Sequence, residues 1–149
     1  MNKYMQKAIK EAKKGIFNYE GGPFGCIIVK DGKIVGRGHN QVVRLNDPTC
    51  HGEMQAIRNA CRNLKTFDLS GCELYTTAAP CPMCNGAIKW ANIKKVYYGC
   101  TLKDTDSIGF RDVDFYESEG KEDYLVEVDR KDCLDLFQEY VNITDKTHY

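Results

Sequence analysis

Two short motifs in the middle of the chain could bind a metal ion together. His51 lies two residues before Glu53, and Cys81 and Cys84 form a Cys-x-x-Cys pair that follows a proline. Cysteines three positions apart on a helix share one face, so both sulfur atoms can reach one ion. A helix N-terminus also lowers the pKa of a thiol, which favours the metal-binding thiolate. Zinc accepts such a mixed set of nitrogen and sulfur ligands.

The number of ligands indicates a catalytic zinc ion. Structural zinc sites usually have four protein ligands, whereas catalytic sites have three and a water. Three candidates are present, His51, Cys81 and Cys84. Cys50 is a poor fourth ligand, because neighbours on a helix point about 100° apart. The open position would hold a water whose pKa the metal lowers toward neutrality, and Glu53 is the candidate base for that water.

Each motif alone has a simpler interpretation. A His-x-Glu triplet by itself usually carries no function, and an isolated Cys-x-x-Cys pair is as often a redox or a structural zinc motif. Here the two occur together, each at the start of a predicted helix. The combination therefore predicts one catalytic zinc ion per chain, bound by His51, Cys81 and Cys84, with Glu53 as the catalytic acid and base.

The elements that must position these residues alternate between helix and strand. Asp31-Gly32 is a strong hairpin signal between two apolar stretches, and Asp47 and Pro48 predict the start of the helix that contains His51. The predicted helices are 5–16, 48–61, 81–90 and 131–141, the predicted strands 24–29, 33–38, 72–77, 95–99 and 124–128, and 101–119 is predicted as mostly loop. This alternation predicts an α/β sandwich.

Composition narrows the class of protein. The chain has 149 residues, the size of one domain, with 21 basic and 21 acidic side chains and no net charge. Domains that hold a nucleic-acid backbone usually show a basic stripe, so a small substrate is favoured over nucleic acid. No apolar run has membrane length, and the first residues lack the apolar core of a signal peptide. We therefore expect a cytoplasmic protein with no membrane partner.

Eight cysteines in a reducing compartment indicate metal binding or burial rather than disulfides. Those outside the metal motif and its neighbour are predicted to be small buried apolar residues, namely Cys26, Cys61, Cys72, Cys100 and Cys133. His39 and His148 receive no role.

The two motifs together resemble the zinc-deaminase signature, His-x-Glu followed by Pro-Cys-x-x-Cys. The stretches 22–25, 38–40, 46–53 and 80–88 are also similar to the cytidine deaminase superfamily. The resemblance implies a three-layer α/β/α sandwich on a five-stranded mixed sheet, formed by residues 1–149 as one domain. Members of the superfamily deaminate cytosine, cytidine, guanine or adenosine in tRNA.

Within the superfamily, the chain most resembles small bacterial guanine deaminases. Three stretches carry this likeness: 87–91 with its tryptophan, 109–116, and the tail 134–149. The resemblance implies hydrolysis of guanine to xanthine and ammonia in a homodimer. It also implies that the helix and tail at 130–149 close an active site, either that of the partner subunit after an exchange of tails or that of the same subunit.

The resemblance also implies which residues contact the base. Asn40 would read the base with an amide that both donates and accepts, and Phe24 would stack on its ring. Asp112 would help to bind and protonate the substrate, and Gly52 and Tyr149 complete the substrate-binding set. Without the resemblance, Asn40 could cap a strand, Phe24 could be core, Asp112 could be a solvated acid and Tyr149 a frayed terminus.

Two departures keep other substrates open. Gly52 stands where the guanine deaminases commonly have alanine and small fungal cytosine deaminases have glycine, and Arg111 replaces a frequently acidic residue. Cytosine deamination is therefore the alternative function. A tRNA adenosine deaminase needs a basic surface for a flipped base, which the neutral chain does not indicate. A non-catalytic zinc module would have no use for Glu53 beside an open metal position.

Overall fold

The computed structural model describes residues 2–118, 124 and 126–147. The chain divides into two compact units, Met1–Glu117 and Ser118–Tyr149, and each is described by itself. The prediction that residues 1–149 act as one domain stays a prediction. Among the described residues, none of the helices has both the length and the apolar character needed to span a bilayer.

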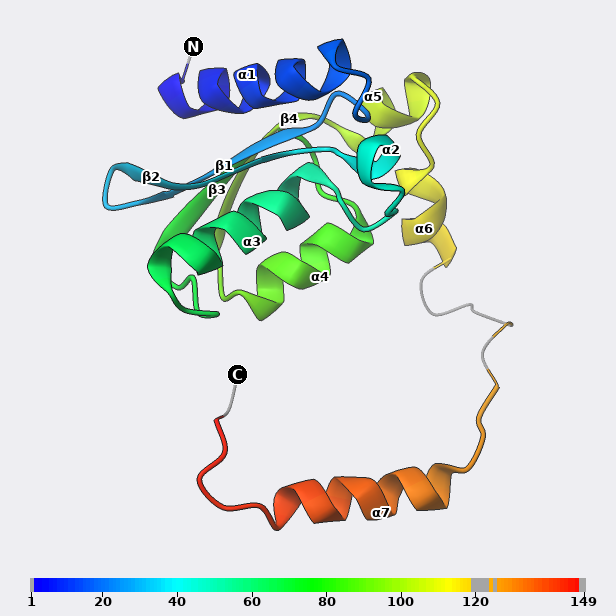
Figure 1. Ribbon diagram of the computed structural model, residues 1–149. Coiled ribbons are helices and arrows are strands. Elements are labelled where there is room, and N and C mark those ends of the chain that lie inside the picture. Colours follow the sequence, from blue (N-terminus) through cyan, green and yellow to red (C-terminus); the bar gives the residue numbers. More distant parts are fainter. Residues whose placement is uncertain (1, 119–123, 125, 148–149) are drawn as a thin grey trace. The chain divides into compact units, whose positions relative to one another are not determined.

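The first unit is built on a mixed sheet of four strands in the order β2-β1-β3-β4 (Figure 1). β1 (Gly25–Lys30) pairs antiparallel with both β2 (Lys33–His39) and β3 (Cys72–Ala78). β3 and β4 (Lys95–Cys100) are parallel. The mixed α/β architecture that the sequence predicts is therefore confirmed, and the expected strands at 24–29, 33–38, 72–77 and 95–99 are all present.

The β1–β2 hairpin turns as its sequence predicts. Asp31 and Gly32 have φ values of 50° and 76°, and both therefore lie in the left-handed region. A two-residue turn of this kind matches the right-handed twist of the strands it joins, and Asp-Gly adopts it readily.

Helices cover both faces of the sheet. α1 (Lys3–Phe17) lies on one face, and α3 (Gly52–Leu64) and α4 (Pro82–Trp90) lie on the other (Figure 1). On the α1 side, Ala8 packs against Ile27, Val29 and Tyr75 of the sheet. These three layers bury an apolar core on each side of the strands.

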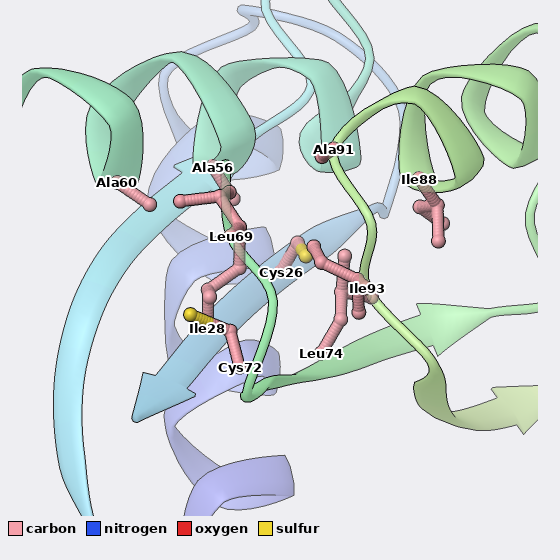
Figure 2. Packing of buried hydrophobic residues seen from close by; sticks show 10 residues of the cluster. All are labelled: Cys26, Ile28, Ala56, Ala60, Leu69, Cys72, Leu74, Ile88, Ala91 and Ile93. Atoms are coloured by element: carbon pink, nitrogen blue, oxygen red, sulfur yellow. The ribbon is translucent and has the colours of Figure 1, made fainter. Parts of the chain in front are cut away.

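The larger core cluster fills the space between the sheet and the second helical layer. Figure 2 shows its ten members, which come from the strands, from both helices and from the connections between them: Cys26, Ile28, Ala56, Ala60, Leu69, Cys72, Leu74, Ile88, Ala91 and Ile93. Cys26 and Cys72 are buried as predicted. Cys100 and Cys133 are exposed, so their predicted burial is wrong, because one ends the edge strand β4 and the other lies on an exposed helix.

The fifth strand expected at 124–128 does not appear in the described part of that stretch, so the predicted five-stranded sheet is not confirmed. Tyr124 lies in a turn, and the backbone of 126–128 has no regular structure. The side chains of Tyr124, Val126 and Val128 are 79%, 79% and 67% exposed. Alternating apolar residues indicate that one face of a strand could be buried. A strand also needs a neighbouring strand to bond its backbone N–H and C=O groups, and the alternation does not indicate one.

The region 101–119, predicted as loop, contains two short helices. α5 (Leu102–Ser107) starts at a capping box, in which Thr101 and Asp104 each accept the other's backbone N–H. α6 (Asp112–Ser118) follows. Helices this short have too few apolar residues to show a helical period in a polar sequence.

The helix that carries His51 begins later than predicted. Asp47 caps a turn instead, because its carboxylate accepts from the backbone N–H and the hydroxyl of Thr49 at 2.8 and 2.7 Å. α3 starts at Gly52 with His51 as its N-cap, and a short helix α2 (Val42–Leu45) precedes it. Local side-chain bonds of this kind compete with helix initiation.

The second unit contains α7 (Arg130–Val141), which confirms the helix predicted at 131–141. Several large apolar side chains of this helix are exposed, including Leu136 (60%), Phe137 (65%) and Val141 (62%).

Two glycines of β2 set the distance between the sheet and α3. A Cβ atom added to Gly36 would lie 2.7 Å from the carbonyl oxygen of Ala56, and one added to Gly38 would lie 2.4 Å from the backbone nitrogen of Ala56. Both contacts are with backbone, which cannot rotate away. The helix therefore lies directly on the strand, with no side chain between them.

We expect Gly38→Ala to lower the free energy of unfolding by about 2 kcal/mol or more, because the added methyl overpacks this contact. Gly86→Ala is the matched control. A Cβ at Gly86, within α4, meets no heavy atom within 4 Å, so alanine should raise stability by about 0.5–1 kcal/mol through its helix propensity. Urea unfolding of zinc-loaded protein measures both changes. Equal stability of Gly38→Ala and the natural chain would show that α3 can move.

Candidate active site

The three predicted metal ligands meet where two helices begin. His51 is the N-cap of α3, Cys81 is the N-cap of α4, and Cys84 lies in the first turn of α4. Nδ1 of His51 is 3.5 Å from Sγ of Cys81 and 3.6 Å from Sγ of Cys84. The three ligand atoms lie within 4.8 Å of one another, and no other such group occurs among the described residues.

The donor set fits a zinc ion. The hydrogen bond with Cys84 lowers the pKa of Cys81 to about 4, and the same bond raises the pKa of Cys84 well above the range of an ordinary thiol. The pair therefore holds one proton between two sulfurs, a place that a cation can take. Cys50 is not part of the group, since its Sγ accepts from Nη1 of Arg58 at 3.8 Å. Three ligands match a catalytic zinc site.

Glu53 lies beside the metal site and is 5% exposed. Its Oε1 accepts a hydrogen bond from the hydroxyl of Thr76 at 2.7 Å, which fixes the carboxyl group in α3 against β3. Burial raises the pKa of Glu53 above its ordinary value. A carboxyl group whose pKa is moved toward neutrality suits proton transfer in both directions.

A pocket of about 480 Å³ opens next to these residues and includes His51, Glu53 and Cys81 in its wall. The rest of the wall comes from the loop before β1, from Asn40 and α2, from Pro48, from the end of β3, from the start of α4 and from the segment 110–115. Its further members are Gly21, Gly22, Phe24, Asn40, Val42, Val43, Pro48, Ala78, Ala79, Pro82, Met83, Phe110, Arg111, Asp112 and Phe115. Most of them are apolar, as expected of a site that binds a small molecule.

Three predicted substrate-binding residues lie in this wall. Phe24 packs edge to face against Phe110, with ring centroids 4.9 Å apart. Asn40 is 4% exposed, and its Oδ1 accepts the backbone N–H of Val42 at 3.1 Å. Asp112 stands in the first turn of α6, and burial raises its pKa above the ordinary aspartate value.

The other two residues predicted to contact the substrate are Gly52 and Tyr149. Gly52 is not among the pocket residues; a Cβ there would lie 2.9 Å from the carbonyl oxygen of Phe24, so Gly52 lets α3 begin close to that loop. Tyr149 falls outside the described residues.

Sequence reasoning missed several wall residues. Phe110 and Phe115 lie in the stretch that carries the resemblance, and aromatic residues within a polar segment were the available signal. Val42 and Val43 gave no signal, because their helix was not predicted. In the sequence Thr76 is an ordinary strand residue. Its role, a hydrogen bond to the carboxylate of Glu53, appears only in the folded chain.

Residues 1–100 match the cytidine and deoxycytidylate deaminase zinc-binding region, and the chain belongs to this family. The fold and the three-ligand site agree with that membership, so the protein is a zinc-dependent hydrolytic deaminase. The chain is 40% identical to the guanine deaminase of Bacillus subtilis (strain 168), over 98% of this chain and 97% of that protein. It is therefore a guanine deaminase homologue.

Solved structures give the same picture. The X-ray structure of the Bacillus subtilis guanine deaminase matches with a TM-score of 0.94 over 100% of this chain and 99% of that one. Guanine deaminase from Nitrosomonas europaea matches at 30% identity with a TM-score of 0.69, over 73% of this chain and 63% of that one. The tRNA-specific adenosine deaminase of Aquifex aeolicus is 47% identical, but only over 67% of this chain and 66% of its own length.

The metal site makes a direct prediction. Cys81→Ala should reduce zinc from about one ion per chain to nearly none, because two ligands cannot complete a tetrahedral site. Cys133→Ala, which removes an exposed thiol of α7, is the control and should keep a full complement of zinc. Elemental analysis after dialysis against a mild chelator measures both. Full zinc content in Cys81→Ala would mean that other residues bind the ion.

Proposed function

We propose that this protein hydrolyses guanine to xanthine and ammonia. The observation that carries the proposal is the extent of the likeness to guanine deaminase, which covers 98% of this chain and 97% of the relative. The likeness to the tRNA deaminase covers only 67% of the chain. The full-length likeness includes α5, α6 and α7, and α6 supplies Asp112 and Phe115 to the pocket.

In this proposal His51, Cys81 and Cys84 hold the zinc ion. When bound, zinc acts as a Lewis acid and makes a water molecule nucleophilic near neutral pH. Glu53 would accept one proton from the attacking water and deliver it to a ring nitrogen. It would then transfer the second proton, from the hydroxyl group added to the ring carbon, to the amine, which leaves as ammonia. The hydrogen bond from Thr76 keeps the Glu53 carboxylate aimed into the pocket during these transfers.

Other residues of the pocket wall would bind the base. Phe24 and Phe110, whose rings pack edge to face, provide an apolar wall on which a purine ring would stack. Asn40 offers an amide to the edge of the base, and Asp112 offers a carboxyl group whose raised pKa allows it to donate or accept a proton. Gly52 contributes indirectly, by keeping the loop of Phe24 close to α3.

Ammonia release from guanine, cytosine, adenine and their nucleosides, measured side by side, tests the substrate. We expect kcat/KM for guanine to exceed that for every other compound by about a hundredfold or more, since a buried polar site rejects ligands that leave its groups unpaired. Preference for cytosine would support the alternative function. Turnover of adenosine in a tRNA anticodon arm alone would support an RNA-editing enzyme.

The control for this assay is Glu53→Gln. The amide has about the same size as the carboxylate but cannot accept the proton, so turnover should fall by about 10² to 10⁴ while zinc content stays full. A variant that keeps more than a tenth of the activity would mean that another group is the base.

We further propose a homodimer in which the helix and tail at 130–149 cover the active site of the partner subunit. The exposed apolar side chains of α7 support this, because a soluble chain rarely leaves such a surface uncovered. Exchange of an identical segment also joins two subunits at low cost. Tyr149 would then complete the wall of the pocket and help to exclude water.

Deletion of residues 146–149 tests the tail. Guanine turnover should fall about tenfold or more, because bulk water then competes for the polar groups around the base. Zinc content and the unfolding midpoint should stay unchanged. A truncated protein as active as the full chain would contradict the lid and favour the cytosine deaminase alternative.

We also propose a cytoplasmic location. All eight cysteines are free thiols, and two of them are metal ligands that must stay reduced. A reducing compartment keeps them in that state.

A further inference from the structure

A histidine outside the pocket lies between two carboxylates. His39, the last residue of β2, places Nε2 2.5 Å from Oε2 of Glu20 and Nδ1 3.2 Å from Oε2 of Glu11. The three side chains are only 15%, 11% and 7% exposed. Each ring nitrogen of His39 is thus within hydrogen-bond distance of a carboxylate oxygen, which accepts a hydrogen bond when it is ionised.

The carboxylates have further cationic partners. Nη1 of Arg44 lies 2.9 Å from Oε1 of Glu20, and Nζ of Lys14 lies 2.7 Å from Oε1 of Glu11. Burial by itself would raise the pKa of each glutamate. Hydrogen bonds from Lys14 and His39 outweigh this effect at Glu11, and those from His39 and Arg44 outweigh it at Glu20. The pKa values of both glutamates are therefore lowered. We call Glu11, Glu20, His39 and Arg44 the charged cluster.

The charged cluster does not line the pocket, but three of its members adjoin residues that do. His39 precedes Asn40, Glu20 precedes Gly21, and Arg44 follows Val43. The cluster thus connects the end of β2, α2 and the loop that follows α1. The pocket residues Asn40, Val43 and Gly21 lie next to these three cluster members in the chain.

Backbone bonds strengthen this connection. The carbonyl oxygen of Glu20 accepts from the backbone N–H groups of Val43 and Arg44, both at 3.0 Å. Asn40 donates its own backbone N–H to the carbonyl of Phe24 at 2.9 Å. A shift of Glu20 therefore moves α2 and the loop together.

The residues around Asn40 are tightly packed. A Cβ on Gly21 would lie 2.1 Å from Oδ1 of Asn40, and a Cβ on Gly15 of α1 would lie 2.9 Å from Cδ2 of His39. Displacement of His39 must therefore be transmitted to Asn40 and to the loop that faces it.

We propose that His39 is a positioning residue for substrate binding. It holds Glu11 and Glu20 in place, and the pocket residues Asn40, Gly21 and Val43 thereby keep the positions in which they contact the base. This inference rests on the proposed function. The metal ligands and Glu53 come from α3 and α4 instead, so loss of the charged cluster should affect binding and not the chemical step.

The test is steady-state kinetics of zinc-loaded His39→Gln with guanine. Glutamine has one amide nitrogen, so one carboxylate would face a carbonyl oxygen and lose its donor. We expect KM, and the inhibition constant of the product xanthine, to rise about tenfold or more, with kcat within about threefold of the natural enzyme and zinc content unchanged.

Arg44 supplies a second variant that does not depend on the folding of His39→Gln, because its side chain is 59% exposed. Arg44→Ala should raise KM in the same direction, and Arg44→Lys, which keeps the positive charge, should restore most of it. Lys14→Ala is the matched control: it removes a cation from Glu11, but Lys14 adjoins no pocket residue, so KM should not change.

Two results would overturn the inference. If KM is unchanged in His39→Gln and Arg44→Ala while the unfolding midpoint falls, the charged cluster stabilises the fold and has no role in substrate binding. A fall in kcat at constant KM would place its effect on the chemistry. If the natural enzyme does not turn over guanine, the proposed function fails separately, and the same KM comparison is made with the base that the substrate panel identifies.

Discussion

The structure depends on the meeting of two helix N-termini at one point. α3 and α4 lie on the same face of the sheet, and their N-caps are His51 and Cys81. The positive ends of both helix dipoles favour thiolate sulfur, and the two sulfurs in turn favour a dication. Every other feature of the site is arranged around this point. Glu53 follows His51 by half a helical turn, which carries its side chain inward to Thr76.

The pocket has two sides with different origins. The chemical side comes from α3 and α4, which lie within residues 1–100 and so within the family's defining region. Part of the binding side, including Phe110, Asp112 and Phe115, lies beyond that region. In the proposed function, this later segment would contribute to the choice of base, while the candidate metal ligands all lie within residues 1–100.

The features predictable from sequence were those determined by a few neighbouring residues. Asp31-Gly32 determines its own turn, and Cys81 and Cys84 share a helix face at any position in a fold. Other features depend on distant partners. The sequence around Asp47 resembles a helix start, yet its carboxylate binds Thr49, and the alternating residues of 124–128 form no strand. His39 had no assigned role, because Glu11 and Glu20 approach it only in the folded chain.

The glycines of β2 have a consequence for how the core can vary among related sequences. Because backbone atoms at Gly36 and Gly38 touch α3, the spacing of these two layers is set by the main chain and not by side-chain size. A larger residue at Ile28 or Leu74 cannot be accommodated by lifting the helix without also moving His51 and Glu53. Gly25 of β1 restricts α1 in the same way, since a Cβ there would lie 2.1 Å from the carbonyl oxygen of Ala8, so side-chain volume should be conserved closely on both sides of the sheet.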